Sequence, residues 1–471
     1  MKINRAMLKR WIVRFVLLAI LVISLFRFVG FVVQFGNESI QMDFSASYTA
    51  AESLNAGLSP YENHLKRDPP IWDGVCLYKH SRFTYTPLVA FVTRPLALLS
   101  YKHAKHVWML ILLVSVFISL FIAVHISGIQ KSSELFLGLG IFTCLFFPLL
   151  AELERGQIDA INLLLIMISM YFMLKKGNAQ LVAGVMLALA TFFKLYCIFL
   201  IPFLVLRRKW KVLAGYLVGM VLFLIVSFIA CGSLCNDYWS KHLPRISQYQ
   251  EEGTEEMLLS PPITVPLYLK YTKTPHEMTV KDGRYYNFTV FRFTHNATLV
   301  KALRDTRVGK SFYDWLEKIG LGHHQDSSLA LALLGTFIIS LILLLLKYFK
   351  SNTALSPFQE LIYWQIVLIV IVLSGVRTWA MNTVWFMPAS IILFYGYKTQ
   401  KSKGVFFYLC LCALGLIIAA MTDAAFLRVI PFSSELLLFK YIIAGLLMFI
   451  SLVLLLRAYL CTKERASNIR L

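Results

Sequence analysis

The stretch KVLAGYLVGMVLFLIVSFIACG, residues 211–232, carries its single charge at Lys211, the first position. An α-helix rises 1.5 Å per residue, so about 20 apolar residues cross the roughly 30 Å hydrocarbon core of a bilayer. The stretch therefore predicts a membrane-crossing helix. Comparable apolar runs lie at 15–34, 106–127, 135–150, 160–174, 328–346, 358–374, 383–397, 404–422 and 434–456.

The composition of the whole chain points to the same class of protein. The 471 residues are 58% hydrophobic and their mean hydropathy is +0.68, which is typical of polytopic membrane proteins and not of soluble domains. We predict an all-α polytopic membrane protein, with a bundle of about ten crossing helices in one membrane-embedded domain spanning 1–471. The first run lacks a small-residue cleavage site, so we expect it to be retained.

Residues 181–206 need a separate interpretation, because Lys194 lies in the middle of an apolar run. Basic clusters stand at both ends of this run, at Lys175-Lys176 and at 207–211. A single crossing would place one of these clusters outside. A re-entrant hairpin of two short helices, with Lys194 near its tip, keeps both clusters on the inside, and we predict that hairpin.

The basic residues then concentrate on one face. Lys and Arg number 46 against 25 Asp and Glu, for a net charge of +21, and the excess falls in the inside connectors, the two termini and the spans. This is the positive-inside pattern. It predicts a multi-pass protein with both termini cytoplasmic, and the basic charge implies no nucleic-acid partner. We expect the membrane to be a bacterial inner or plasma membrane.

The longer loops fall on the outer face, where we expect the chemistry. The segment 35–105 is expected to contain two interfacial helices, at 43–54 and at 88–100 with an interruption at Pro95. A second outer loop covers 233–327.

Asp43 is the first candidate for chemistry in the outer segment. An acid at the start of a helix can cap the helix and interact favourably with its dipole. At the membrane edge it can also act as a general base or a charged anchor. The pattern alone leaves both interpretations open.

Further polar residues stand between or within apolar runs. The segment ELERGQID, residues 152–159, places three acids, Arg155 and Gln157 between two spans, where they pair with one another or line a substrate site. Lys194 either extends to the outer interface or binds a phosphate. Arg377 offers a second cation, and the indole of Trp379 could stack on a sugar ring.

Several common motifs are missing from the sequence. It contains no GxxxxGK[ST], no HExxH and no GxSxG, and its eight cysteines lack metal-ligand spacing. We expect no cofactor and no metal.

Taken in order, these segments resemble glycosyltransferase family 87, a family of C-type membrane glycosyltransferases. The matching features are an early acid in the first outer loop, a Tyr-x-Pro, a Gly-Gln and a Lys within a span. In this chain they are Asp43 to Tyr61, Tyr85-Thr86-Pro87, Gly156-Gln157-Ile158-Asp159, Lys194, Asn296-Ala297-Thr298-Leu299, and Thr378-Trp379 through Val384-Trp385 and Pro388.

The resemblance implies an inverting transfer of a sugar, such as mannose, from a polyprenyl-phosphate donor to a lipid or glycan acceptor on the outer face. Asp43 matches the acid that the family uses as catalytic base. A leaving phosphate needs cations and no protein acid, so Lys194, Arg155 and Arg377 are the candidates to stabilise it. The remaining candidate substrate-binding residues are Tyr48, Tyr61, Tyr85, Gln157, Asp159, His295, Asn296 and Trp379.

The chain departs from the family pattern at three places. Met381-Asn382 stands where the family often has adjacent His, so that role falls to His295 or is absent. Cys197 replaces a Pro after the Lys, and Asp159 replaces an Asn after Gly-Gln. The substrates are therefore expected to differ from those of the mannolipid enzymes.

Two other functions fit parts of the pattern. A transporter or flippase for lipid-linked saccharides would use Asp43 and Lys194 as a substrate gate, and a non-catalytic scaffold in envelope assembly would use neither. A transporter needs access from both sides, whereas the long loops here lie on one face. This asymmetry favours the glycosyltransferase.

Overall fold

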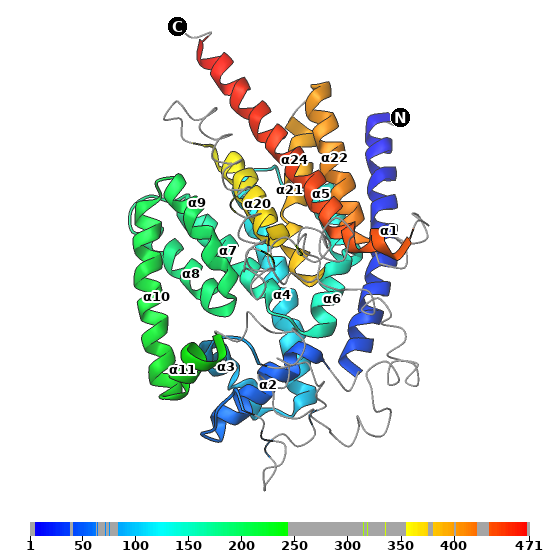
Figure 1. Cartoon of the computed structure of the whole chain (residues 1–471). Helices are drawn as coiled ribbons and strands as arrows, with labels where there is room; N and C mark the ends of the chain where they lie inside the picture. The colour runs from blue at the N-terminus through cyan, green and yellow to red at the C-terminus, as the bar shows by residue number, and fades with distance from the viewer. Residues whose placement is uncertain are drawn as a thin grey trace. The chain divides into compact units, whose positions relative to one another are not determined.

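The computed structural model describes residues 5–37, 41–62, 64, 71, 75, 83–243, 314, 318, 335, 355–374, 380–399, 402–421 and 433–468. Within these ranges every regular element is a helix, as the all-α prediction requires (Figure 1). The chain divides into two compact units, one of Met1–Val33, Ser119–Ala151 and Phe293–Leu471, the other of Gln34–Ile118 and Glu152–Arg292. We describe each unit by itself, and the single domain over 1–471 stays a prediction.

Six of the described helices are long and apolar enough to cross a membrane. They lie at Met7–Asn37, Tyr101–Ser127, Trp210–Cys231, Pro357–Ser374, Lys403–Ala420 and Lys440–Leu460. A seventh span is formed if Ser133–Leu145 and Phe147–Arg155, which meet at 54°, count as one. The multi-pass membrane protein is therefore supported by its helices, but the predicted count of about ten is not confirmed.

Three of the predicted spans account for the difference between the ten predicted spans and the seven found when the bent pair counts as one. The run 160–174 forms α7 (Asp159–Met173), whose 15 residues extend only about 22 Å. The run 383–397 is split between a 3-10 helix, η6 (Ala380–Phe386), and α21 (Ala389–Thr399). Pro388 lies at the split, where its ring and missing N–H stop a continuous helix. The run 328–346 lies outside the described residues except for Gly335.

The first unit contains most of α1 (Arg5–Asn37), α5 (Ser133–Leu145), α20 (Pro357–Ser374), η6, α21, α22 (Lys403–Ala420) and α24 (Ser433–Asn468). Helices α22 and α24 pack closely, because Gly415 has no side chain to hold them apart. Arg14 of α1 pairs with Glu134 of α5 at 2.6 Å. Helix α20 is almost wholly buried, and Gln365 on it donates to the carbonyl of Trp385 at 2.9 Å.

The second unit begins with the two helices expected in the first outer segment. Helix α2 (Met42–Asn55) packs against α3 (Pro87–Thr93), and a short 3-10 helix, η1 (Leu96–Leu98), follows Pro95. The helices thus occur where they were predicted, and their position at a membrane interface stays a prediction. Helix α4 (Tyr101–Ser127) begins in this unit and continues into the first unit after Ile118, and α6 (Phe147–Arg155) ends in this unit.

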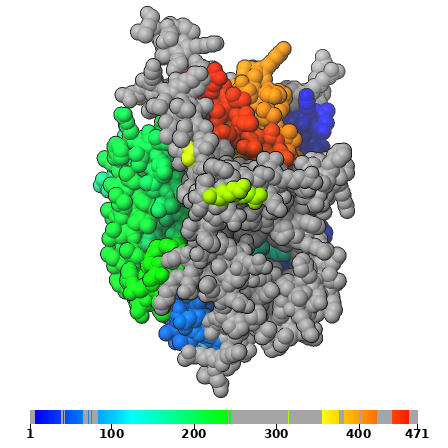
Figure 2. All heavy atoms as spheres, in the orientation of Figure 1, coloured from blue at the N-terminus to red at the C-terminus, as the bar shows by residue number. Residues whose placement is uncertain are grey.

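Three helices of the second unit lie side by side (Figure 1): α7, α8 (Ala179–Phe193) and α10 (Trp210–Cys231). Close glycine contacts fix the direction of α8 against α10. Gly184 lies against the backbone of Val212, and further along both helices a Cβ on Gly219 would lie 2.7 Å from that of Ala188. Residue numbers rise together along the contact, so the two helices are parallel. The outward side of α10 is apolar and forms part of the surface drawn in green in Figure 2, with Leu217, Val221 and Ile225 exposed.

Because α8 and α10 are parallel, the chain between them must return from the C-terminal end of α8 to the end at which α8 began. That return is made by η2 (Leu195–Leu200) and α9 (Ile201–Leu206), and the reversal occurs at Lys194, whose backbone is extended at φ −142° and ψ 112°. The chain ends its described part in this unit with α11 (Leu234–Asp237) and a π-helix, η3 (Tyr238–His242). That residues 181–206 form a re-entrant hairpin in a membrane stays a prediction.

Candidate functional site

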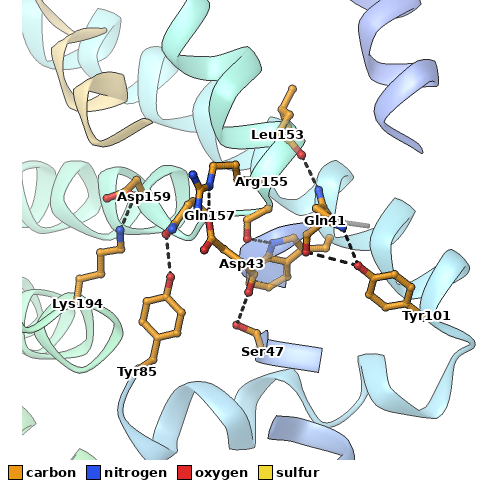
Figure 3. A network of polar contacts seen from close by, with 12 residues as sticks. Gln41, Asp43, Ser47, Tyr85, Tyr101, Leu153, Arg155, Gln157, Asp159 and Lys194 are labelled. Atoms are coloured by element: carbon orange, nitrogen blue, oxygen red, sulfur yellow. Dashed lines mark hydrogen bonds and ion pairs between the residues drawn. The ribbon is translucent and has the colours of Figure 1, made fainter. Parts of the chain in front are cut away.

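Asp43 lies in the first turn of α2 and forms an ion pair with Arg155, the last residue of α6 (Figure 3). Nε of Arg155 is 2.7 Å from Oδ2 of Asp43, and each side chain is 17% exposed. The residue at the N-cap position is Gln41, not Asp43, and its side chain makes no capping hydrogen bond. The carboxylate of Asp43 is thus directed to a cation 112 positions away in the sequence.

The start of α2 is held against the turn that follows α6. The side-chain amide of Gln41 donates to the carbonyl of Leu153 at 2.5 Å, and the backbone N–H of Gln41 donates to the hydroxyl of Tyr101 at 3.0 Å. The indole of Trp108 donates to the carbonyl of Gly156 at 2.8 Å. These bonds fix Asp43 relative to Arg155.

Gly156 makes this close contact possible. Its φ of +70° lies in the left-handed region, where glycine is favoured because it has no Cβ. A Cβ at this position would also lie 2.5 Å from Cβ of Phe44 and 2.8 Å from Cδ of Gln41. The glycine of the Gly-Gln pair therefore ends α6 and lets α2 pack directly on the turn.

Gln157, the next residue, binds Tyr85. The Tyr85 hydroxyl donates to Oε1 of Gln157 at 2.8 Å. Burial raises the pKa of Tyr85 well above its ordinary value, and the nearby carboxylates of Asp43, Asp159 and Glu152 raise it further. The hydroxyl therefore stays protonated at neutral pH and acts as a hydrogen-bond donor.

Asp159 binds two side chains, one with each carboxylate oxygen. Nζ of Lys194 is 2.5 Å from Oδ2, and the Tyr196 hydroxyl donates to Oδ1 at 2.5 Å. Asp159 begins α7, and Lys194 directly follows α8. The two helices have 15 residues each and are joined by a short loop, so an antiparallel hairpin brings its first and last residues to the same end.

Glu152 is fully buried beside this group. Its Oε1 accepts from the backbone N–H of Ala160 at 2.9 Å, at the N-terminus of α7, where an anion is favoured. Within the described part of the chain, its Oε2 makes no hydrogen bond. Segment 152–159 thus has a partner for each of Glu152, Arg155, Gln157 and Asp159, and all of these contacts lie within the second unit.

Six of the predicted site residues meet in this network (Figure 3), which we call the polar network: Asp43, Tyr85, Arg155, Gln157, Asp159 and Lys194. Tyr61 adjoins it, since its hydroxyl donates to the carbonyl of Tyr85 at 2.9 Å. Tyr48 is buried among Phe44 and Tyr101, and its hydroxyl donates to the carbonyl of Leu99 at 2.6 Å. His295, Asn296, Arg377 and Trp379 lie outside the described residues.

Sequence reasoning missed Tyr196, Gln41 and Trp108. Tyr196 stands two residues after Lys194, and this proximity was the one available signal for it. Gln41 and Trp108 resembled ordinary residues of a helix start and of a span. Among the described residues no group of three or more His, Cys, Asp and Glu could hold a metal ion, and a metal-free reaction stays a prediction.

Part of the chain matches a known protein family. The sequence signature of glycosyltransferase family 87 matches residues 83–261. The matched segment contains Tyr85, the whole of 152–159 and Lys194, and it begins after Asp43. No curated protein matches the chain.

Proposed function

We propose that this protein transfers a sugar from a polyprenyl-phosphate donor to an acceptor hydroxyl, with inversion. Its residues 83–261 belong to glycosyltransferase family 87. The acceptor is a lipid or a glycan, and the reaction takes place on the outer face of the membrane. The observation that carries the proposal is the pairing of Asp43 with Arg155 at 2.7 Å, in one network with Lys194. Sugar transfer follows from the family, and the donor, mechanism and sidedness are our inference.

The proposed reaction divides the network into a base and two cations. Asp43 removes the proton from the acceptor hydroxyl as that oxygen attacks the anomeric carbon of the sugar. The bond between the anomeric carbon and the phosphate oxygen breaks, and its electron pair leaves with the phosphate. One displacement inverts the anomeric centre and needs one carboxylate.

The cations match the charge that develops on the leaving group. A phosphodiester with one negative charge becomes a monoester, which carries up to two. Arg155 and Lys194 supply positive charge near it, and electrostatic stabilisation of this kind is usually a large part of catalysis. The Tyr85 hydroxyl, protonated at neutral pH, donates to Gln157 beside these groups.

A donor with a lipid tail suits the architecture. The polar network lies at the ends of the apolar helices α7 and α8, and α10 of the same unit presents an apolar outer side. A prenyl chain can remain in the bilayer beside such helices while its phosphate reaches Lys194 or Arg155.

The proposal is tested by transfer of radiolabelled sugar in membranes supplied with a series of polyprenyl-phosphate sugars. Asp43→Asn keeps the size of the side chain and removes the base, so we expect a loss of about 100- to 10,000-fold in rate. Glu62→Gln is the matched control, because Glu62 is an exposed acid just after α2, and it should transfer at the wild-type rate. Equal transfer by wild type and Asp43→Asn at equal protein level would remove Asp43 from the mechanism.

A further inference from the structure

The ion pair of Lys194 and the ion pair of Arg155 have different surroundings. The Asp43–Arg155 pair includes the acid that the proposed reaction uses as base. Asp159 is completely buried, and both of its oxygens already have partners. The two cations are therefore expected to respond differently to an incoming anion.

Tyr196 gives the second pair an additional hydrogen-bond donor. A buried carboxylate that loses its counter-ion is strongly destabilised unless other hydrogen bonds remain. If Lys194 moved away, Asp159 would keep the Tyr196 hydroxyl on Oδ1 at 2.5 Å. Hydrogen bonds to ionised groups are shorter and stronger than neutral ones, so this bond lowers the cost of releasing the lysine.

Lys194 is also suited to movement. Its ammonium group is a compact charge with three donors at the end of a flexible stem, and one of these donors is used by Asp159. The residue lies at the chain reversal, outside the regular turns of α8 and η2. Nζ is 5.6 Å from the centre of the Tyr196 ring, and the Lys194 side chain keeps 10% of its surface exposed.

We propose that Lys194, Asp159 and Tyr196 form an ion-pair exchange site, in which the phosphate of the lipid-linked donor takes the Lys194 ammonium group from Asp159. Tyr196 is a positioning residue that keeps Asp159 hydrogen-bonded during the exchange. This inference rests on the proposed function, since it takes the donor phosphate as the incoming anion. It assigns Lys194 to the phosphate and leaves Arg155 with Asp43.

The exchange predicts the effect of each substitution on phosphate binding. Without the Tyr196 hydroxyl, Asp159 depends more on Lys194, so the lysine is released less readily. Tyr196→Phe should then weaken phosphate binding without removing any positive charge. The double variant Asp159→Asn with Lys194→Met keeps the net charge, leaves no unpaired buried charge, and should lose the phosphate-dependent part of binding.

The test measures binding of radiolabelled undecaprenyl phosphate to the purified full chain in nanodiscs. Undecaprenol, which lacks the phosphate, reports the contribution of the tail, and inorganic phosphate as competitor reports that of the head group. We expect Tyr196→Phe to bind undecaprenyl phosphate about tenfold more weakly than wild type, in line with one hydrogen bond to a charged group. The double variant should bind the phosphate no better than the alcohol.

Tyr171→Phe is the matched control, because Tyr171 lies on α7 and its ring also faces a lysine, Lys175, with Nζ 4.7 Å from the ring centre. It should bind as wild type does. Wild-type affinity in Tyr196→Phe or in the double variant, or no preference of wild type for the phosphate over the alcohol, would overturn the exchange site.

Sugar transfer separates this inference from the proposed function. Wild-type transfer rates in the double variant would refute the exchange site and the role of Lys194 on the leaving phosphate, and would leave sugar transfer with Asp43 as the base standing. Phosphate-dependent binding through Lys194 in a protein that transfers no sugar from any donor would refute the proposed reaction and leave the exchange site standing.

Discussion

Gly156 is the residue on which the position of Asp43 depends most directly. Substitution by Ala adds a Cβ in the left-handed region, which costs about 1–2 kcal/mol, and drives that Cβ into Phe44 at 2.5 Å. The second effect moves α2 and therefore moves Asp43 away from Arg155. We expect Gly156→Ala to lower both the thermal stability in detergent and the rate of sugar transfer, the latter by more than tenfold.

The variant Gly177→Ala distinguishes the effect of backbone strain from the effect of displacing α2. Gly177 has a φ of +73°, almost that of Gly156, but nothing lies within 4 Å of its added Cβ. It should lose only the stability due to strain and keep its activity. Equal losses of activity in the two variants would show that contact with α2 is not what makes Gly156 necessary.

At the same scale, the sequence identified the chemical groups but not their pairing. The sequence pattern singles out Asp43, Arg155, Gln157, Asp159 and Lys194, and the family resemblance adds Tyr85. The structure brings these six residues together. Their partners depend on which helix ends meet, which no local pattern encodes. For the same reason no local pattern indicated that Tyr48 packs against Phe44 and Tyr101 and donates its hydroxyl to the carbonyl of Leu99.

Among the elements, the contact of α8 with α10 decides where Lys194 lies. A Cβ on Gly184 would collide with the backbone of Val212, and backbone cannot give way as a flexible side chain can. We expect Gly184→Ala to separate the helices and destabilise the protein by about 1–3 kcal/mol, measured by thermal unfolding in detergent.

Gly30→Ala provides the comparison, since Gly30 is also helical but nothing lies within 4 Å of its added Cβ. Alanine has the higher helix propensity, so this variant should be as stable as wild type or slightly more so. A Gly184→Ala protein as stable as Gly30→Ala would show that α8 and α10 can move apart without cost.

Sequence patterns predicted the existence of elements better than their extent. The helix expected at 43–54 is found at Met42–Asn55, and the interruption at Pro95 is present between α3 and η1. The apolar run 383–397 predicts one span, but Pro388 divides it into η6 and α21. The contrast shows that apolar composition locates buried helices but does not require them to be straight.

For the whole molecule, the parallel arrangement of α8 and α10 makes a prediction about topology. Residues before α8 and before α10 lie at the same end of these helices, so the loops at 175–177 and 207–209 should face the same side. Both carry basic residues, so we expect them to lie in the cytoplasm with the C-terminus.

Reporter fusions at 177, 209 and the C-terminus check this arrangement. We expect green fluorescent protein to fluoresce at all three positions and alkaline phosphatase to be inactive at all three. Opposite results at 177 and 209 would mean that residues 179–209 cross the membrane once, contrary to the hairpin at Lys194.

At this scale composition predicted the class of fold but not the number of crossings. A mean hydropathy of +0.68 indicates a membrane protein with helical spans, and the regular elements of the described residues are helices. Composition cannot distinguish a crossing helix from a short helix such as α7, because both are equally apolar. Composition also cannot predict that distant segments such as Gln34–Ile118 and Glu152–Arg292 form one unit.

The length of the nine-residue segment from Glu152 to Ala160 sets the spacing of the site residues. Along this segment Arg155, Gln157 and Asp159 each bind a different partner, and the backbone N–H of Ala160 donates to Glu152. One residue inserted into α6 would turn the residues that follow by about 100°, the angle per residue of a helix, and shift them by about 1.5 Å. One residue inserted into the turn would change the spacing of Arg155, Gln157 and Asp159. Recombination between related enzymes should therefore tolerate no change in the length of this segment, and chimaeras designed to exchange substrate specificity should be joined outside it.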